Sequence, residues 1–351
     1  MTTTDSRRAR AARRRRMQRR KKIKNTLLLL LLFAVIGGIG GSALYIIKYG
    51  FYSNLTKPFD SYTEFENTFV GNQSQRSAAF AEDLCVVTGN VALEGASLEG
   101  TQSGVLLDLN DEEVMYAQGV YEKIYPASIT KIMTAMLAFR YADMDETITI
   151  TQENITLEEG SQVCGFWAGD RVTMKELVYS LLVYSGNDAA SAIATHVGGT
   201  TENFVDMMNS YAAQLGCTGT HFTNPHGLHD ENHYTTTYDI YLMLKEALKY
   251  PTFTEITQLS SYTLNYTRSD GTAVSTYLEA TDHYLTGESN APKNVVILGG
   301  KTGTTSAAGN CLALLSQNAF GKPYVSIVTG ASTKDILYQQ MNSLLEHIND
   351  V

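Results

Sequence analysis

The sequence predicts a mixed α/β fold, of the α+β type, in which an antiparallel sheet is flanked by helices. Apolar segments of strand length lie toward both ends of the chain body, and segments with the apolar spacing of a helix lie between them. We therefore expect one sheet completed by both ends of the chain, with a helical subdomain between. An uncharged run near the amino terminus adds one transmembrane helix before this body.

Charge is distributed very unevenly along the chain. The first 24 residues hold twelve of the 27 Lys and Arg residues and one of the 36 Asp and Glu residues, so the remainder carries a net charge of −20. Hydrophobic residues at 44% and charged residues at 18% exclude a disordered chain. The basic block precedes an apolar run, so we interpret it as a topology signal and not as a nucleic acid-binding segment.

The apolar run, residues 26–47, holds 22 residues without a charge. A helix of that length spans about 33 Å, which is enough to cross a bilayer. The positive-inside rule then makes residues 1–25 a basic cytoplasmic tail, followed by a polar stalk or linker at 48–83 and an exported domain at 84–351. A cleaved secretory signal is the alternative, because Gly41-Ser42-Ala43 has the small residues of a cleavage site. Either way the body is exported.

Within the body, periodicity predicts the elements in chain order. We predict strands at residues 84–87, 103–109, 114–117, 294–298, 311–315 and 324–329, and helices at 128–140, 173–183, 202–214, 239–248 and 336–347. Thr173-Met174-Lys175-Glu176 has the form of a capping box, which places a helix start there.

Three short motifs carry candidate chemistry. The first, Ser128-Ile129-Thr130-Lys131, lies at a predicted helix start, where positions i and i+3 share a face, so the Lys131 amine can reach the Ser128 hydroxyl. A serine is a poor nucleophile unless a neighbouring base takes its proton, and a lysine can do so when burial or a nearby cation lowers its pKa. Ser185-Gly186-Asn187 and Lys301-Thr302-Gly303 are the other two. Each of the three, taken alone, is also typical of an ordinary cap or turn.

Together and in this order, the three motifs resemble the SxxK, SxN and KTG set of penicillin-binding proteins and serine β-lactamases. The surrounding sequence is similar to that of the low-molecular-mass D-alanyl-D-alanine carboxypeptidases, from about residue 84 to the end. The segments that carry this similarity are Tyr125-Pro126-Ala127-Ser128, Ser185-Gly186-Asn187-Asp188-Ala189-Ala190, Phe222-Thr223-Asn224-Pro225-His226-Gly227-Leu228, His233-Tyr234-Thr235-Thr236 and Gly300-Lys301-Thr302-Gly303-Thr304.

The resemblance implies a DD-peptidase/β-lactamase-like fold and a serine D,D-carboxypeptidase that removes the terminal D-Ala from peptidoglycan stem peptides. Ser128 would form the acyl-serine intermediate, Lys131 would act as the base, and Ser185 would relay a proton to the leaving amine. Asn187, Lys301, Thr302, Gly303 and Thr304 would bind substrate, with the backbone N–H groups of Ser128 and Thr304 as the oxyanion hole. No cofactor or metal is implied. β-Lactam antibiotics would be covalent inhibitors, and the enzyme would be held at the bacterial cell membrane with its catalytic domain outside.

Several alternatives stay open at this point. A D,D-endopeptidase acting on cross-links would use the same residues, and a penicillin-binding sensor with little turnover would share the acylation step. A β-lactamase is disfavoured because no Glu-x-x-Leu-Asn segment lies between the second and third motifs. The related carboxypeptidases carry an arginine beyond KTG, whereas here no arginine follows Arg268, so Lys334 is the candidate to replace it.

The histidines and cysteines suggest further alternatives. Four histidines between residues 221 and 233, beside Asp230 and Glu231, could form a zinc site, but HExxH is missing and we expect a polar loop near the cleft. The four cysteines allow a Cys85–Cys311 disulfide between predicted strands, although we favour buried free thiols.

Overall fold

The computed structural model describes residues 22, 24, 83–96, 98 and 103–349. The predicted transmembrane helix at 26–47 and nearly all of the predicted tail and stalk lie outside these residues. Among the residues described, no helix is long and apolar enough to cross a membrane.

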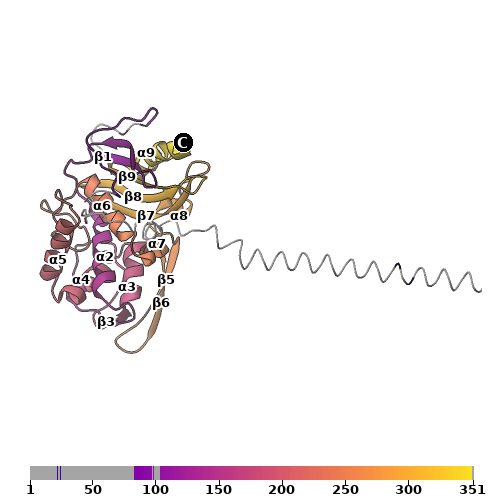
Figure 1. Cartoon of the computed structure of the whole chain (residues 1–351). Helices are drawn as coiled ribbons and strands as arrows, with labels where there is room; N and C mark the ends of the chain where they lie inside the picture. Colours follow the sequence, from indigo (N-terminus) through magenta and orange to yellow (C-terminus); the bar gives the residue numbers. More distant parts are fainter. Residues whose placement is uncertain (1–21, 23, 25–82, 97, 99–102, 350–351) are drawn as a thin grey trace, which may run out of the picture. The chain divides into compact units, whose positions relative to one another are not determined.

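Two antiparallel sheets organise the described body (Figure 1). The five-stranded sheet has the order β2-β1-β9-β8-β7, and the four-stranded sheet has the order β3-β4-β5-β6. The strands are β1 (Ser103–Asp108), β2 (Glu113–Gln118), β3 (Thr147–Thr149), β4 (Arg171–Thr173), β5 (Ser261–Thr267), β6 (Ala273–Glu279), β7 (Val296–Thr305), β8 (Gly309–Gln317) and β9 (Pro323–Ala331). Strand β1, from the start of the body, pairs with β9 from its end. The expectation of one sheet completed by both ends of the chain is therefore confirmed.

The helices lie between β2 and β7, as predicted, except α9 (Lys334–Leu345), which follows β9 and corresponds to the predicted closing helix. They are α2 (Lys131–Tyr141), α3 (Met174–Tyr179), α4 (Asn187–Gly198), α5 (Thr201–Gln214), α6 (Thr237–Ala247), α7 (Pro251–Thr257), α8 (His283–Thr286) and α9 (Lys334–Leu345), with short 3₁₀ or π turns labelled η3 (Ala127–Thr130), η4 (Glu153–Ile155), η5 (Ser180–Tyr184) and η6 (Glu346–Asn349). The predicted capping box exists, because the Thr173 side chain accepts a hydrogen bond from the Glu176 N–H at 3.2 Å.

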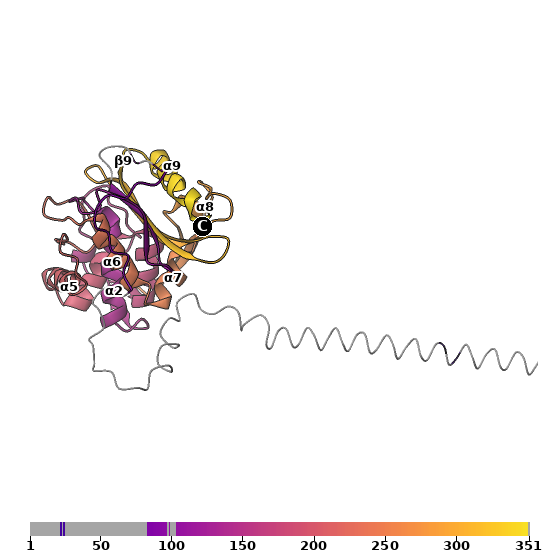
Figure 2. The same cartoon turned by 45° about the horizontal axis from the view of Figure 1, so that its top comes forward.

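The five-stranded sheet is buried on both faces. Along β1, Val105 and Leu107 point into the main core, whereas Leu106 between them joins the cluster formed with α9. This alternation follows from the two-residue period of a strand. Figure 2 shows α9 on one side of the sheet and α2 and α6 on the other. Helix α2 has its first eight residues buried, so it crosses the interior of the body and fixes the residues at its amino terminus.

One predicted strand is wrong, and several elements were not predicted. Residues 84–87 form no strand, because the Cys85 N–H donates to the Tyr241 hydroxyl at 3.0 Å instead of to a neighbouring strand. The four-stranded sheet was not predicted, since β3 and β4 have only three residues each and β6 is mostly exposed. Helix α4 was also missed, because its first eight residues are all buried although Asn187, Asp188 and Ser191 among them are polar.

Candidate active site

Ser128 lies on the 3₁₀ turn η3, directly before the buried helix α2. The preceding residue, Ala127, has a φ of +47°, a left-handed conformation that costs a non-glycine residue about 1 kcal/mol or more. Gly303 and Gly227 both approach the backbone of this turn closely. A Cβ on Gly303 would lie 2.9 Å from the Ser128 nitrogen, and a Cβ on Gly227 would lie 1.8 Å from the Ala127 carbonyl oxygen. Two neighbouring segments thus hold the turn in place.

Lys131 is fully buried beneath Ser128. Its Nζ lies 2.8 Å from Ser128 Oγ, 2.7 Å from Asn187 Oδ1 and 2.7 Å from the His226 carbonyl oxygen. Burial, followed by the nearby positive charge of Lys301, lowers the pKa of Lys131 well below its ordinary value. A neutral amine satisfies this geometry fully, because its two N–H groups face two carbonyl oxygens and its lone pair faces the Ser128 hydroxyl. The arrangement can therefore take a proton from Ser128.

The second motif begins with a residue in a special backbone conformation. Ser185 has a φ of +68° at the end of the π turn η5, and Asn187 begins helix α4. The buried Asp188 carboxylate fixes this corner, because it accepts backbone N–H groups from Cys164 at 2.9 Å and Gly165 at 3.1 Å. The motif is thereby tied to residues 160–166, part of which lines the pocket described below.

The third motif lies within β7, the edge strand of the five-stranded sheet. Lys301 is buried, and its Nζ donates to Ser185 Oγ at 3.0 Å and to the Thr302 carbonyl oxygen at 2.9 Å. Burial lowers the pKa of Lys301 to about 7, although the negative charge of Asp282 acts in the opposite direction. Both lysine pKa values are therefore depressed by burial, and that of Lys131 is lowered further by the positive charge of Lys301.

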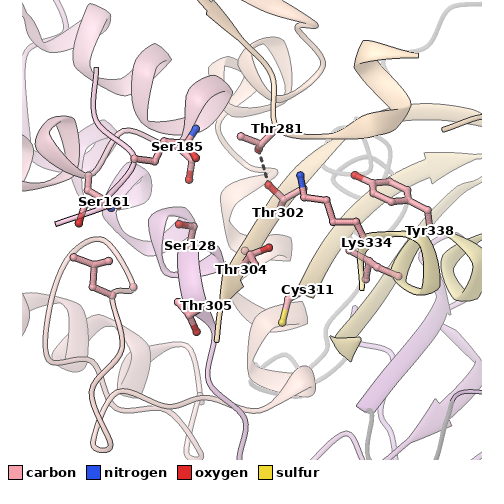
Figure 3. Close-up of a pocket in the computed structure, with 17 residues that line it drawn as sticks. Ser128, Ser161, Ser185, Thr281, Thr302, Thr304, Thr305, Cys311, Lys334 and Tyr338 are labelled. Atoms are coloured by element: carbon pink, nitrogen blue, oxygen red, sulfur yellow. Dashed lines mark hydrogen bonds between the residues drawn. The ribbon is translucent and has the colours of Figure 1, made fainter. Parts of the chain in front are cut away.

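The three motifs meet at one cavity of about 260 Å³ (Figure 3). Of the predicted site residues, Ser128, Ser185, Asn187, Thr302, Gly303 and Thr304 line it. Lys131 and Lys301 are buried behind the cavity wall and bond to residues that line it, Lys131 to Ser128 and Asn187 and Lys301 to Ser185 and Thr302. Lys334, the candidate to replace the missing arginine, also lines the cavity, and Figure 3 shows its amine directed toward Thr302.

Several residues of the site escaped the sequence-based prediction. Thr281 lines the cavity and its Oγ1 lies 2.5 Å from that of Thr302, while Tyr338 and Ser161 line other parts of the wall. The His226 carbonyl that holds Lys131 is a backbone atom, which residue-type reasoning cannot single out. The only sequence signal for it was the Asn224-Pro225-His226-Gly227-Leu228 stretch, whose Asn224 Oδ1 accepts the Gly227 N–H at 2.7 Å.

The histidines between residues 221 and 233 do not form a metal site, and the buried His233 is held by hydrogen bonds within the protein. His233 is buried, with Nδ1 accepting the Thr223 N–H at 3.0 Å and Nε2 lying 2.8 Å from Thr130 Oγ1. Burial lowers the pKa of His233 to about 4 and that of His226 to about 3, so both are neutral imidazoles at pH 7. In the described part of the chain, no group of three or more His, Cys, Asp or Glu residues could hold a metal ion. The four cysteines are buried free thiols, as we favoured, so no Cys85–Cys311 disulfide exists.

This fold and site match a known family. Residues 94–333 match the family model described as D-alanyl-D-alanine carboxypeptidase. The chain belongs to this family. It is 33% identical over 253 residues to D-alanyl-D-alanine carboxypeptidase DacF of Bacillus subtilis, and 31% identical over 253 residues to D-alanyl-D-alanine carboxypeptidase DacC of Escherichia coli. These alignments cover 70% and 69% of the chain but only 61% and 59% of the two relatives.

Solved structures of the carboxypeptidase family and its neighbours share the fold. A D-alanyl-D-alanine carboxypeptidase from Mycobacterium tuberculosis superposes with a TM-score of 0.63 at 26% identity, covering 74% of this chain and 93% of that one. The Streptomyces K15 DD-transpeptidase superposes with a TM-score of 0.65 at 23% identity, covering 73% of this chain and 98% of that one. The mixed α/β fold with antiparallel sheets is therefore that of the DD-peptidases, as the sequence predicted.

Proposed function

We propose that this chain is a serine D,D-carboxypeptidase that removes the terminal D-Ala from peptidoglycan stem peptides. The observation that carries the proposal is the contact of 2.8 Å between Ser128 Oγ and the Nζ of the fully buried Lys131. A lysine held neutral by burial is a base strong enough to activate a serine, and general-base assistance typically contributes about 10²–10⁴-fold in rate. The relatives named D-alanyl-D-alanine carboxypeptidase support the choice of substrate.

In the acylation step, Ser128 Oγ attacks the carbonyl carbon between the two terminal D-Ala residues while its proton passes to Lys131 Nζ. The resulting oxyanion is stabilised by the backbone N–H groups of Ser128 and Thr304, because the first N–H groups of a helical turn have no partner within the turn. Gly303 makes this approach feasible, since only a residue without Cβ lets β7 lie against the Ser128 nitrogen.

Collapse of the tetrahedral intermediate breaks the C–N bond, and the departing D-Ala amine needs a proton. Ser185 relays it, because its Oγ faces the same cavity as Ser128 and takes a replacement proton from Lys301 Nζ, which donates to it at 3.0 Å. Water then attacks the acyl-serine ester and gives one proton back to Lys301 through Ser185. Ser128 Oγ recovers its proton from Lys131 as the shortened peptide leaves. Asn187 binds the peptide amide while its Oδ1 keeps Lys131 oriented at 2.7 Å.

The substrate's terminal carboxylate binds at Thr302, Lys301 and Lys334. Lys334 takes the role of the arginine that the sequence lacks after residue 268. It offers one ammonium group in place of a bidentate guanidinium fork, so we expect weaker orientation of the carboxylate than an arginine gives. A β-lactam carries a carboxylate in the equivalent position and acylates Ser128 in the same way.

We place residues 84–351 outside the cytoplasmic membrane as the catalytic domain, tethered by an anchor at 26–47 and a stalk at 48–83, with 1–25 in the cytoplasm. The support for this is the charge-free run behind a basic block. Cell fractionation of the full-length chain, with protease added to intact spheroplasts, tests it. Cleavage of the body without permeabilisation is expected, and protection of the body would exclude this topology.

The central experiment is covalent labelling of the full-length chain by a fluorescent penicillin, followed by intact mass. The wild-type chain should gain one penicillin, and Ser128→Ala should gain none. Ser161→Ala is a matched control, because Ser161 also lines the cavity but lies in no motif, and it should still be labelled. Release of D-Ala from a synthetic peptide ending in D-Ala-D-Ala then tests the substrate. Labelling of Ser128→Ala would refute the assignment of the nucleophile.

A further inference from the structure

Three consecutive residues, Thr281, Asp282 and His283, act on the three groups that the proposed function assigns to the substrate carboxylate, two of them by contact and Asp282 by its charge. They lie between strand β6 and the short helix α8, outside the three sequence motifs. Thr281 Oγ1 is 2.5 Å from Thr302 Oγ1, and His283 Nε2 is 3.3 Å from Lys334 Nζ. Asp282, between them, contributes the negative charge that acts on Lys301.

Asp282 is unusual because it is a buried carboxylate whose hydrogen bonds are incomplete. Its side chain is 4% exposed. Oδ1 accepts the Tyr284 N–H at 3.0 Å and the Tyr338 hydroxyl at 3.1 Å, whereas Oδ2 has no partner within the described part of the chain. The two donors to Oδ1 favour the ionised form, and burial favours the neutral form and raises the pKa of Asp282. A carboxylate kept in such a place needs a charge partner.

Lys301 is the cation on which this charge acts. The contact between Thr281 and Thr302 brings the chain segments of Asp282 and Lys301 together, and the negative charge of Asp282 raises the pKa of Lys301 without a direct ion pair between the two side chains. The hydrogen bonds of Lys301 go to a serine hydroxyl and a backbone carbonyl, neither of which carries a charge. His283 and Tyr284 from α8 and Tyr338 from α9 act on Asp282, and the positive charge of Lys301 acts in turn on Lys131. His283 itself faces Lys334 at 3.3 Å and the exposed Glu288 carboxylate at 3.5 Å. Among the described residues, Asp282 is the carboxylate whose charge acts on Lys301.

We propose that Thr281-Asp282-His283 is a positioning segment for the carboxylate pocket, in which the buried Asp282 carboxylate is the counter-charge that favours the ammonium form of Lys301. The inference rests on the proposed function, since it concerns the same pocket. Thr281 holds the Thr302 hydroxyl in place, and His283, which stacks on Tyr338 at 4.8 Å with an interplanar angle of 7°, holds the Lys334 amine. None of the three needs to touch the reacting atoms.

The test is the pH dependence of acylation in full-length protein held in detergent micelles, with a fluorescent penicillin well below saturation. Under these conditions the second-order rate constant reports the ionisation of the free enzyme. Acylation by the wild type should fall as pH rises through the pKa of Lys301, because the penicillin carboxylate then loses a cation. Asp282→Asn keeps an acceptor oxygen for Tyr284 and Tyr338 and removes only the charge. It should move this basic limb about one pH unit lower.

Two variants separate charge from structure. Glu279→Gln removes an exposed acid three residues before Asp282 and should leave the basic limb in place. Thr281→Val keeps the side-chain shape and removes the hydroxyl, so it should lower acylation about tenfold at every pH without moving the limb. Thr281→Val also keeps the inference testable if Asp282→Asn does not fold.

The outcomes are distinct. An unchanged basic limb in folded Asp282→Asn would overturn the counter-charge, and unchanged acylation in Thr281→Val would overturn the positioning of Thr302. Absence of any acylation in the wild type would instead refute the proposed function itself.

Discussion

Gly227→Ala tests whether the loop after α5 sets the position of the catalytic lysine. The added Cβ would lie 1.8 Å from the Ala127 carbonyl oxygen and 2.4 Å from its carbon, whereas ordinary contacts begin near 3.4 Å. The loop and the 3₁₀ turn must therefore separate by about 1.5 Å. The neighbouring His226 carbonyl, now 2.7 Å from Lys131 Nζ, would move with the loop.

The expected cost has two parts. Gly227 has a φ of +85°, and an alanine in that region costs about 1–2 kcal/mol. The overlap with Ala127 adds about 1–3 kcal/mol of overpacking. The free energy of unfolding should fall by roughly 2–5 kcal/mol, which for a domain of this size lowers the melting temperature by roughly 5–15 °C. Displacing a catalytic group by about 1 Å costs about 100-fold in rate, so penicillin acylation should fall by about that factor.

Gly271→Ala is the matched control. Gly271 has nearly the same φ, +88°, but nothing lies within 4 Å of its would-be Cβ. The free energy of unfolding of this variant should fall only by the backbone cost of about 1–2 kcal/mol, and its acylation rate should be unchanged. Thermal unfolding measures the stability, and a time course of labelling with fluorescent penicillin measures the acylation rate. If Gly227→Ala and Gly271→Ala proved equal in stability and rate, the loop would not be what holds Lys131, and the reasoning would be refuted.

Three further outcomes are expected. Lys334→Ala should reduce the second-order rate constant for acylation by penicillin by about 10–100-fold, the value of one hydrogen bond to a charged group. Lys334→Arg should retain most of the wild-type rate. Equal rates in the wild type and both variants would exclude Lys334 from the carboxylate site. His226 and His233 have pKa values lowered to about 3 and about 4, so the unfolded chain binds more protons than the native one below about pH 6.5. Urea unfolding should therefore show stability falling by up to ~1.4 kcal/mol per pH unit per histidine as pH drops toward 4, and a flat profile would contradict their burial. Alkylation in denaturant without reductant should label all four cysteines, whereas labelling of only two would reveal a disulfide.

The sequence was informative where chemistry or strong periodicity imposes residue types. Ser128 and Lys131 could be paired from helix geometry alone, and the Thr173 cap followed from its capping box. The sequence was uninformative where the placement of a residue depends on contacts between elements far apart in the chain. The role of Asp282 arises only when α8 packs beside β7, and Lys131 depends on a carbonyl group, which every residue has. Helix α4 was missed because its polar residues Asn187, Asp188 and Ser191 are buried, so their polarity marks contacts inside the fold and not a solvent-exposed face.

The different surroundings of the two buried lysines account for their different roles. Both lose hydration, and the charge of Lys301 further disfavours the charge of Lys131. The two carbonyl oxygens beside Lys131 Nζ carry no charge, and the nearby Asp188 already accepts backbone N–H groups from Cys164 and Gly165. The incompletely hydrogen-bonded carboxylate of Asp282 raises the pKa of Lys301. When only one proton is shared between the two amines, we therefore expect it on Lys301, which suits the proposed roles of Lys131 as base and of Lys301 as the cation that attracts a carboxylate.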